Sequence, residues 1–93
     1  MQPAVIIDTF TYEAFYVITG RGSVITGKVL GDASKVKVGM FINIGGDRFL
    51  IVGIEAFRPL RPTHPIGLLV KGLTQTRIDS FSPGDDFSIL AEK

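Results

Sequence analysis

A glycine-rich stretch around Arg21 is the first candidate for chemistry in this sequence. Residues 19–29 read TGRGSVITGKV, in which Gly20 and Gly22 flank Arg21. Glycines beside a cation could cradle a phosphate, but a phosphate-binding loop needs a helix N-terminus after its glycines. A β-branched run follows here, which favours a strand. We therefore expect a tight corner between two strands. Arg21 is then an exposed side chain that is either solvated or in contact with an anion or a neighbouring domain.

Other residue types that support catalysis or metal binding are sparse. There is no cysteine, which excludes a disulfide scaffold and a thiolate zinc site. The single histidine, His64, lies between prolines with no second imidazole to complete a metal site. Asp85 and Asp86 are adjacent, and neighbouring side chains of a strand point apart. We expect no enzymatic activity, no metal and no cofactor.

Basic residues concentrate in one part of the chain. Ten lysines and arginines against nine acidic residues give a net charge of +1, which does not by itself indicate a nucleic-acid-binding protein. Between Ala56 and Ile78, however, there is no Asp or Glu, and the basic residues there are Arg58, Arg61, Lys71 and Arg77. They form either one positive face or separate solvated side chains on different strands.

The elements that must position these residues are short strands in a single domain. Ninety-three residues, 45% of them hydrophobic and 20% charged, are typical of one globular domain covering 1–93. β-branched and aromatic runs recur between glycine-bearing turns, and no segment holds a helical period beyond about two turns. The expected strands are Phe15 to Thr19, Ser23 to Leu30, Phe41 to Ile44, Arg48 to Phe57, Ile66 to Leu73 and Phe87 to Ala91.

The turns between these strands have recognisable chemistry. Gly45-Gly46-Asp47 supplies the positive φ angles of a tight hairpin, and Ser82-Pro83-Gly84-Asp85 has the composition of a β-turn. The segment Pro59 to Pro65 (PLRPTHP) cannot donate a regular ladder of hydrogen bonds, so it should be an exposed loop or an edge.

Strand 48–57 has an unusual pattern. Strict alternation puts Leu50, Val52, Ile54 and Ala56 on one face and Phe49, Ile51, Gly53, Glu55 and Phe57 on the other, so that both faces are largely apolar. Such a strand suggests a barrel whose outer wall is covered by another segment or by a partner. Because closure removes exposed edges, we predict a small closed antiparallel β-barrel of about six to seven strands.

The order of these features resembles a known family. GRGSVITGKV, KVGMFINIG, FLIVGIEAFRPL, IGLLVKGL and PGDDFSIL follow one another as in domain 2 of elongation factor Tu and related translational GTPases. The resemblance covers about residues 10–91 and implies the β-barrel that lies beside the GTPase domain in those factors. The GxxxxGK[ST] motif is absent, so we expect no GTP binding.

The resemblance also implies a binding role. Residues matching Glu55 and Arg58 help to form the pocket for the 3′ terminal nucleotide of aminoacyl-tRNA in that family. We therefore expect a cytoplasmic, non-enzymatic module that contacts RNA, the ribosome or a translation-related protein and does not bind a membrane. Its candidate binding residues are Arg21, Glu55, Phe57, Arg58 and Arg61. The alternative is a protein-interaction or self-assembly barrel, for example a homodimer, with no nucleic-acid role.

Overall fold

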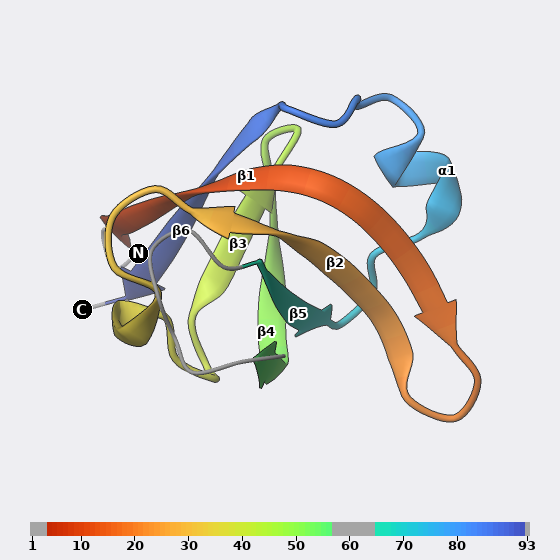
Figure 1. Ribbon diagram of the computed structural model, residues 1–93, viewed down its shortest axis with the longest axis horizontal. Coiled ribbons are helices and arrows are strands. Elements are labelled where there is room, and N and C mark those ends of the chain that lie inside the picture. Colours follow the sequence, from red (N-terminus) through yellow and green to blue (C-terminus); the bar gives the residue numbers. More distant parts are fainter. Residues whose placement is uncertain (1–3, 57–64, 93) are drawn as a thin grey trace.

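The computed structural model describes residues 4–56 and 65–92 as a closed barrel of six antiparallel strands (Figure 1). The strands follow one another around the barrel in the order β1-β2-β5-β4-β3-β6. The predicted all-β barrel of six to seven strands is confirmed. The elements are β1 (Ala4–Ile18), β2 (Gly22–Val29), β3 (Phe41–Ile44), β4 (Asp47–Ala56), β5 (Ile66–Val70) and β6 (Asp86–Glu92).

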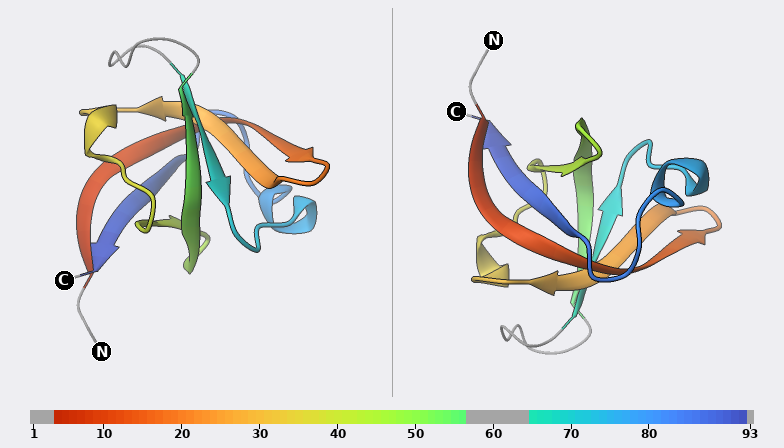
Figure 2. Two further views of the ribbon diagram at one scale, coloured as in Figure 1. Left: turned by 90° about the horizontal axis from the view of Figure 1, so that it is seen from below. Right: turned by 90° about the horizontal axis from the view of Figure 1, so that it is seen from above.

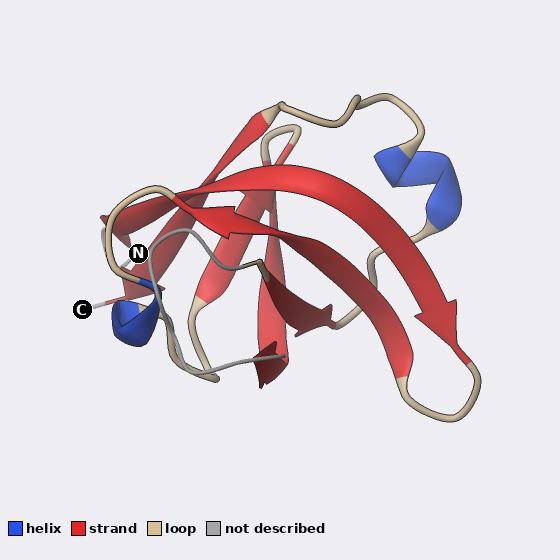
Figure 3. Ribbon diagram, viewed as in Figure 1, coloured by secondary structure: helices blue, strands red, loops and turns tan. Residues whose placement is uncertain are grey.

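Two short helical elements lie between the strands (Figure 3). The 3-10 turn η1 (Ala33–Lys35) follows β2, and the single-turn helix α1 (Gln75–Ile78) follows β5. Each begins after a polar cap, because the Asp32 and Thr74 side chains accept from the backbone N–H of the first turn. Neither element in the described ranges has the length and apolar character of a membrane-crossing helix.

Aliphatic and aromatic side chains from all six strands fill the barrel. Their inward faces form one cluster, to which both helical elements also contribute. The innermost large side chains, which are fully buried, are Phe10, Ile25, Val29, Ile42, Ile44, Ile51, Ile66, Leu68, Ile78 and Ile89. Close packing of this cluster is the main source of stability, since no buried side chain in the described part of the chain is polar or charged.

Strand β1 is much longer than the sequence pattern predicts. We expected a strand from Phe15 to Thr19, but β1 covers Ala4–Ile18. Its first part pairs with β6 and its last part with β2, and the register shifts between Ile6 and Asp8 and again between Tyr12 and Ala14. These bulges break the alternation of period two, which is why the strand is hard to recognise. Its core-facing residues are spaced by three, two and three positions: Ile7, Phe10, Tyr12 and Phe15.

Strand β4 also contains a bulge, and it corrects the interpretation of a strand that is apolar on both faces. The register with β5 shifts between Ile51 and Gly53, so Val52 is an extra residue. Ile51 and Ile54 therefore both pack against the core, although strict alternation places them on opposite faces. Ile51 before the bulge and Ile54 after it thus pack into the same core. This strand gives no reason to expect a covered outer wall.

The predicted glycine turns are confirmed. Gly45 and Gly46 have φ angles of 63° and 90° and join Ile44 to Asp47, which is the first residue of β4. At the other predicted corner, the Arg21 N–H donates to the Ile18 carbonyl at 2.9 Å, and Gly20 has a φ of 81°. A side chain at these positive φ angles would be strained.

The remaining expectations are met with small changes of boundary. β5 ends at Val70 rather than Leu73, although Leu73 is still buried. The turn at 82–85 is confirmed, because the Asp85 N–H donates to the Ser82 carbonyl at 3.0 Å and Gly84 has a φ of 100°. The predicted loop from Pro59 to Pro65 lies, except for Pro65, outside the described residues.

The β1–β2 hairpin extends beyond the rest of the barrel (Figure 2). The two strands of the hairpin can bend and pack closely over the core because Gly27, which has no side chain, pairs with Tyr12. A Cβ atom at Gly27 would lie 2.0 Å from the Thr11 carbonyl oxygen and 2.9 Å from the Phe10 ring. A glycine is therefore required where the two strands cross over the core.

A partly exposed carboxylate, that of Asp8, fastens the loop after β2 to β1. The Asp8 side chain accepts from the backbone N–H groups of Thr9, Gly31 and Asp32 at 2.8–2.9 Å. Partial desolvation disfavours the charged carboxylate, but these N–H groups and the nearby Lys35 outweigh it and lower the pKa of Asp8. Gly31 permits the approach, since a Cβ there would lie 2.4 Å from Asp8 Oδ2.

The Asp8 contact makes stability pH-dependent. Because the pKa of Asp8 is lowered in the folded state, its contribution is present above the ordinary value of 3.8 and is lost as pH falls through the folded pKa. We expect Asp8→Asn to lower the free energy of unfolding by about 1–2 kcal/mol at pH 7. The difference from wild type should shrink below about pH 4, as measured by urea unfolding across pH. The control is Glu13→Gln, whose carboxylate is 3.9 Å from Lys28. An equal loss in both variants would contradict this role.

Candidate binding site

Two of the residues singled out from the sequence meet on the barrel surface. Arg21 Nη2 and Glu55 Oε1 form an ion pair, although the residues come from the β1–β2 turn and from β4. Arg21 is thus not simply solvated, as one of our two expectations had it. The other candidates, Phe57, Arg58 and Arg61, lie outside the described residues, as does His64.

The bulge in β4 sets the direction of Glu55. Beyond Val52 the residues of β4 pair with β5 as Ile54 with Leu68 and Glu55 with Gly67. Ile54 and Leu68 pack in the core, so Glu55 and Gly67 face outward. In a regular strand without the extra residue, Ile54 would point outward. Glu55 would then point toward the core, on the same face as Ile51.

The outward-facing residues around Glu55 are apolar or glycine. We call the outward-facing residues Val24, Gly53, Glu55, Gly67 and Leu69 the outer shelf; they belong to the neighbouring strands β2, β4 and β5. Gly67 lets the Val24 and Glu55 side chains pack closely over it, since a Cβ there would lie 3.2 Å from Val24 Cγ1 and 3.6 Å from Glu55 Cβ. Val24 is only 3% exposed even though it points away from the core. The shelf therefore combines an apolar base with a carboxylate and a guanidinium at its edge.

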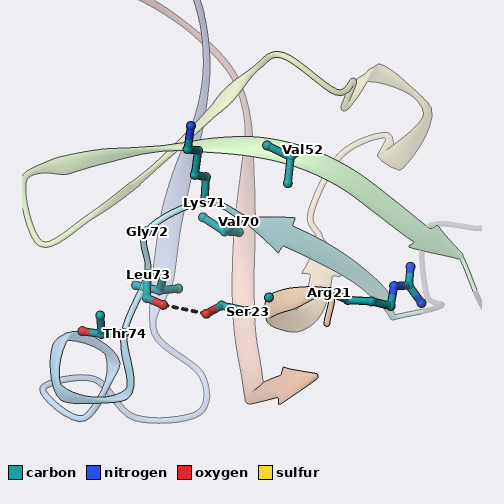
Figure 4. Close-up of a pocket in the computed structure, with 9 residues that line it drawn as sticks. Arg21, Ser23, Val52, Val70, Lys71, Gly72, Leu73 and Thr74 are labelled. Carbon is teal, nitrogen blue, oxygen red and sulfur yellow. Dashed lines mark hydrogen bonds between the residues drawn. The ribbon is translucent and has the colours of Figure 1, made fainter. Parts of the chain in front are cut away.

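A pocket of about 380 Å³ adjoins the shelf where β2 begins and β5 ends (Figure 4). We call it the end pocket. Val52, the bulge residue, points into it, and the Ser23 hydroxyl donates to the Leu73 carbonyl at 2.6 Å across its base. Its lining residues are Arg21, Gly22, Ser23, Val52, Val70, Lys71, Gly72, Leu73 and Thr74.

The end pocket was not predicted from the sequence. Its residues come from the β1–β2 turn, the β4 bulge and the segment after β5, which are far apart along the chain. Of its residues, Arg21 had been named as a candidate binding residue and Lys71 only as a basic residue, and nothing in the sequence placed the two together. The only sequence signal for the pocket was weak: Lys71-Gly72 follows an apolar strand, which indicates a turn. In the structure Gly72 has a φ of 83° and the chain turns away from β5 there.

The basic residues of 56–78 that the structure describes do not form one face. Arg77 pairs with Asp47, whereas Lys71 lines the end pocket. For these two residues the interpretation as separate side chains is therefore the better one. Arg58 and Arg61 lie outside the described ranges.

The described residues contain no group of three or more His, Cys, Asp or Glu side chains that could hold a metal ion. The site is thus an arrangement of one carboxylate, cationic side chains and apolar surface, which suits binding. Comparison with models of known protein families and with curated protein sequences finds no match.

The Arg21–Glu55 pair should matter little for folding. Their side chains are 55% and 26% exposed, and ion pairs at such positions usually contribute less than about 1 kcal/mol. We expect Glu55→Gln to change the free energy of unfolding in urea by no more than about 0.5–1 kcal/mol. A loss of more than about 2 kcal/mol would show that the pair is a structural element. The variant is thus suitable for binding experiments.

Proposed function

We propose that this chain is a non-enzymatic binding module that contacts RNA through the outer shelf and the Arg21–Glu55 pair. The observation that carries the proposal is the meeting of Arg21 and Glu55 on the outward face where Leu69 is partly exposed. The resemblance to domain 2 of elongation factor Tu supports it, because the matching glutamate helps to bind the 3′ end of tRNA there. The closed antiparallel barrel is compatible with that domain.

The chemistry of the shelf suits an unpaired nucleotide. A carboxylate such as Glu55 can accept from a ribose hydroxyl or a base amine, and the guanidinium of Arg21 can contact a phosphate or stack on a base. The base itself can rest on the partly exposed side chain of Leu69, which lies above the buried Val24.

The electrostatics predict modest affinity. A net charge of +1 provides little long-range attraction for RNA, and Glu55 neutralises part of the charge of Arg21. Binding should therefore depend on contacts at one or two nucleotides and only weakly on salt. A 3′ terminal nucleotide, which is free to leave the stack, is the most accessible target.

The RNA proposal is tested by fluorescence anisotropy with a labelled RNA that ends in CCA, at several salt concentrations. We expect saturable binding in which Glu55→Gln raises Kd by about tenfold, because a charge-assisted hydrogen bond to a hydroxyl or amine is lost. Removing the terminal adenosine should weaken wild-type binding by a similar factor.

Lys35→Gln is the matched control, because it removes a charge from η1, a different element from those that form the shelf. It should leave Kd within about twofold of the wild-type value. The proposal is overturned if the wild type shows no saturable binding below about 1 mM at low salt, or if Glu55→Gln binds like the wild type.

Self-association is a second candidate, favoured by the tip of the β1–β2 hairpin. Tyr16 and Val17 are 55% and 68% exposed there. Pairing of β1 with β6 ends at Thr11 and the turn at 84–85 bonds to Tyr12, so residues 14–18 form backbone ladders only with β2 among the described residues. An exposed apolar strand with a free edge can pair with the same segment of a second copy.

Light scattering after gel filtration tests self-association. If the hairpin edges pair, the wild type should be dimeric at about 100 µM, and Val17→Lys should be monomeric because a lysine at an edge disfavours strand pairing. Leu30→Lys, which changes another exposed apolar residue at the far end of β2, should leave the dimer intact. A wild type that stays monomeric at this concentration excludes the candidate.

A further inference from the structure

The end pocket has features that the RNA proposal does not use. Its volume of about 380 Å³ lies within the range of small-molecule and side-chain pockets. Its apolar surface comes from Val52, Val70 and Leu73, and the last two are only 3% exposed. Val52 is 45% exposed and forms one side of the mouth. Most of the accessible apolar surface is therefore that of Val52, and the volume is sufficient for one aliphatic group of moderate size.

The two hydroxyl groups that line the pocket are already engaged within the chain. The Ser23 hydroxyl donates to the Leu73 carbonyl, and the Thr74 hydroxyl accepts from the Arg77 N–H at 3.3 Å. The lining contains no aromatic side chain on which a base could stack. The interior therefore offers a nucleobase no aromatic stacking partner and no uncommitted hydroxyl group for its edge. An aliphatic side chain requires neither.

Positive charge surrounds the mouth. Two of the lining residues, Arg21 and Lys71, are cationic and none is acidic. Lys71 pairs with no carboxylate in the described part of the chain, whereas Arg21 pairs with Glu55. The two head groups leave the pocket in different directions (Figure 4). Anionic groups placed on both sides of a buried aliphatic group would therefore each meet a cation.

Part of the pocket lining consists of glycines, which present only backbone atoms. They are Gly22 and Gly72, and a Cβ at either position would find no atom within 4 Å. A chain can thus lie across the mouth in contact with the backbone, with one side chain directed inward. This is the geometry of a short extended peptide that inserts a single anchor.

We propose that the end pocket binds an acidic peptide segment of a partner protein, inserting one leucine-like side chain between Val52 and Val70 while flanking carboxylates contact Lys71 and Arg21. The juxtaposition of an apolar pocket with two cationic side chains at its mouth, of which Lys71 has no carboxylate partner among the described residues, carries this inference. It does not depend on RNA binding, because Val52 and Lys71 belong to the end pocket alone and only Arg21 borders both surfaces.

The probe is a fluorescein-labelled peptide with one leucine between acidic residues. We expect saturable anisotropy binding to the full chain, weakened at least about tenfold by Val52→Glu, which obstructs the mouth and repels the carboxylates, and about fivefold by Lys71→Gln. The matched controls are Leu30→Glu and Lys35→Gln, at other exposed positions. Circular dichroism shows whether each variant is folded.

Two altered peptides separate the apolar and ionic contributions. Replacing leucine by serine should abolish measurable binding, and replacing the acidic residues by glutamine should weaken it at least about tenfold. The proposal is overturned if the serine peptide binds as well as the leucine peptide, if Val52→Glu and Leu30→Glu bind equally, or if no binding saturates below about 1 mM. Glu55→Gln separates the two proposals, because it should weaken RNA binding without weakening peptide binding.

Discussion

Closure of the barrel through β1 is the constraint on which the rest of the structure depends. This one strand pairs with β6 along its first part and with β2 along its last part, and so joins the two ends of the sheet. A strand that curves around a small barrel cannot keep a regular pleat, and the bulges in β1 supply the bend. Gly27 permits the tight crossing over Phe10, and the Asp8 contact holds the following loop against the same strand.

The same requirement positions the candidate sites. β4 must also bend to pair with β3 at one end and with β5 at the other, and its extra residue, Val52, allows this. The bulge has two further effects. It turns Glu55 outward beside Arg21, and it directs Val52 into the end pocket. A single irregularity that serves the fold therefore creates both the outer shelf and the wall of the neighbouring pocket.

The sequence allowed the class of fold to be predicted but not its irregularities. Glycine turns such as Gly45-Gly46 have a local cause, the positive φ angle, and were therefore predictable. The bulges at Glu13 and Val52 depend on barrel curvature, which no local pattern encodes, so β1 was predicted too short and β4 was misinterpreted. The meeting of Arg21 with Glu55 was equally hidden, because it depends on the register of three strands. The resemblance had pointed to Glu55 and Arg58, not to this pair.

Arg21 links the two surfaces. Its guanidinium pairs with Glu55 at the edge of the shelf, while its stem lines the end pocket. An anion at either surface would compete with Glu55 for the same cation. Because the Arg21 side chain is 55% exposed, solvent screens this competition, and it should amount to less than about 1 kcal/mol. Two ligands could thus bind side by side with only weak mutual antagonism. The apolar contacts, which the two surfaces do not share, would set the specificity of each.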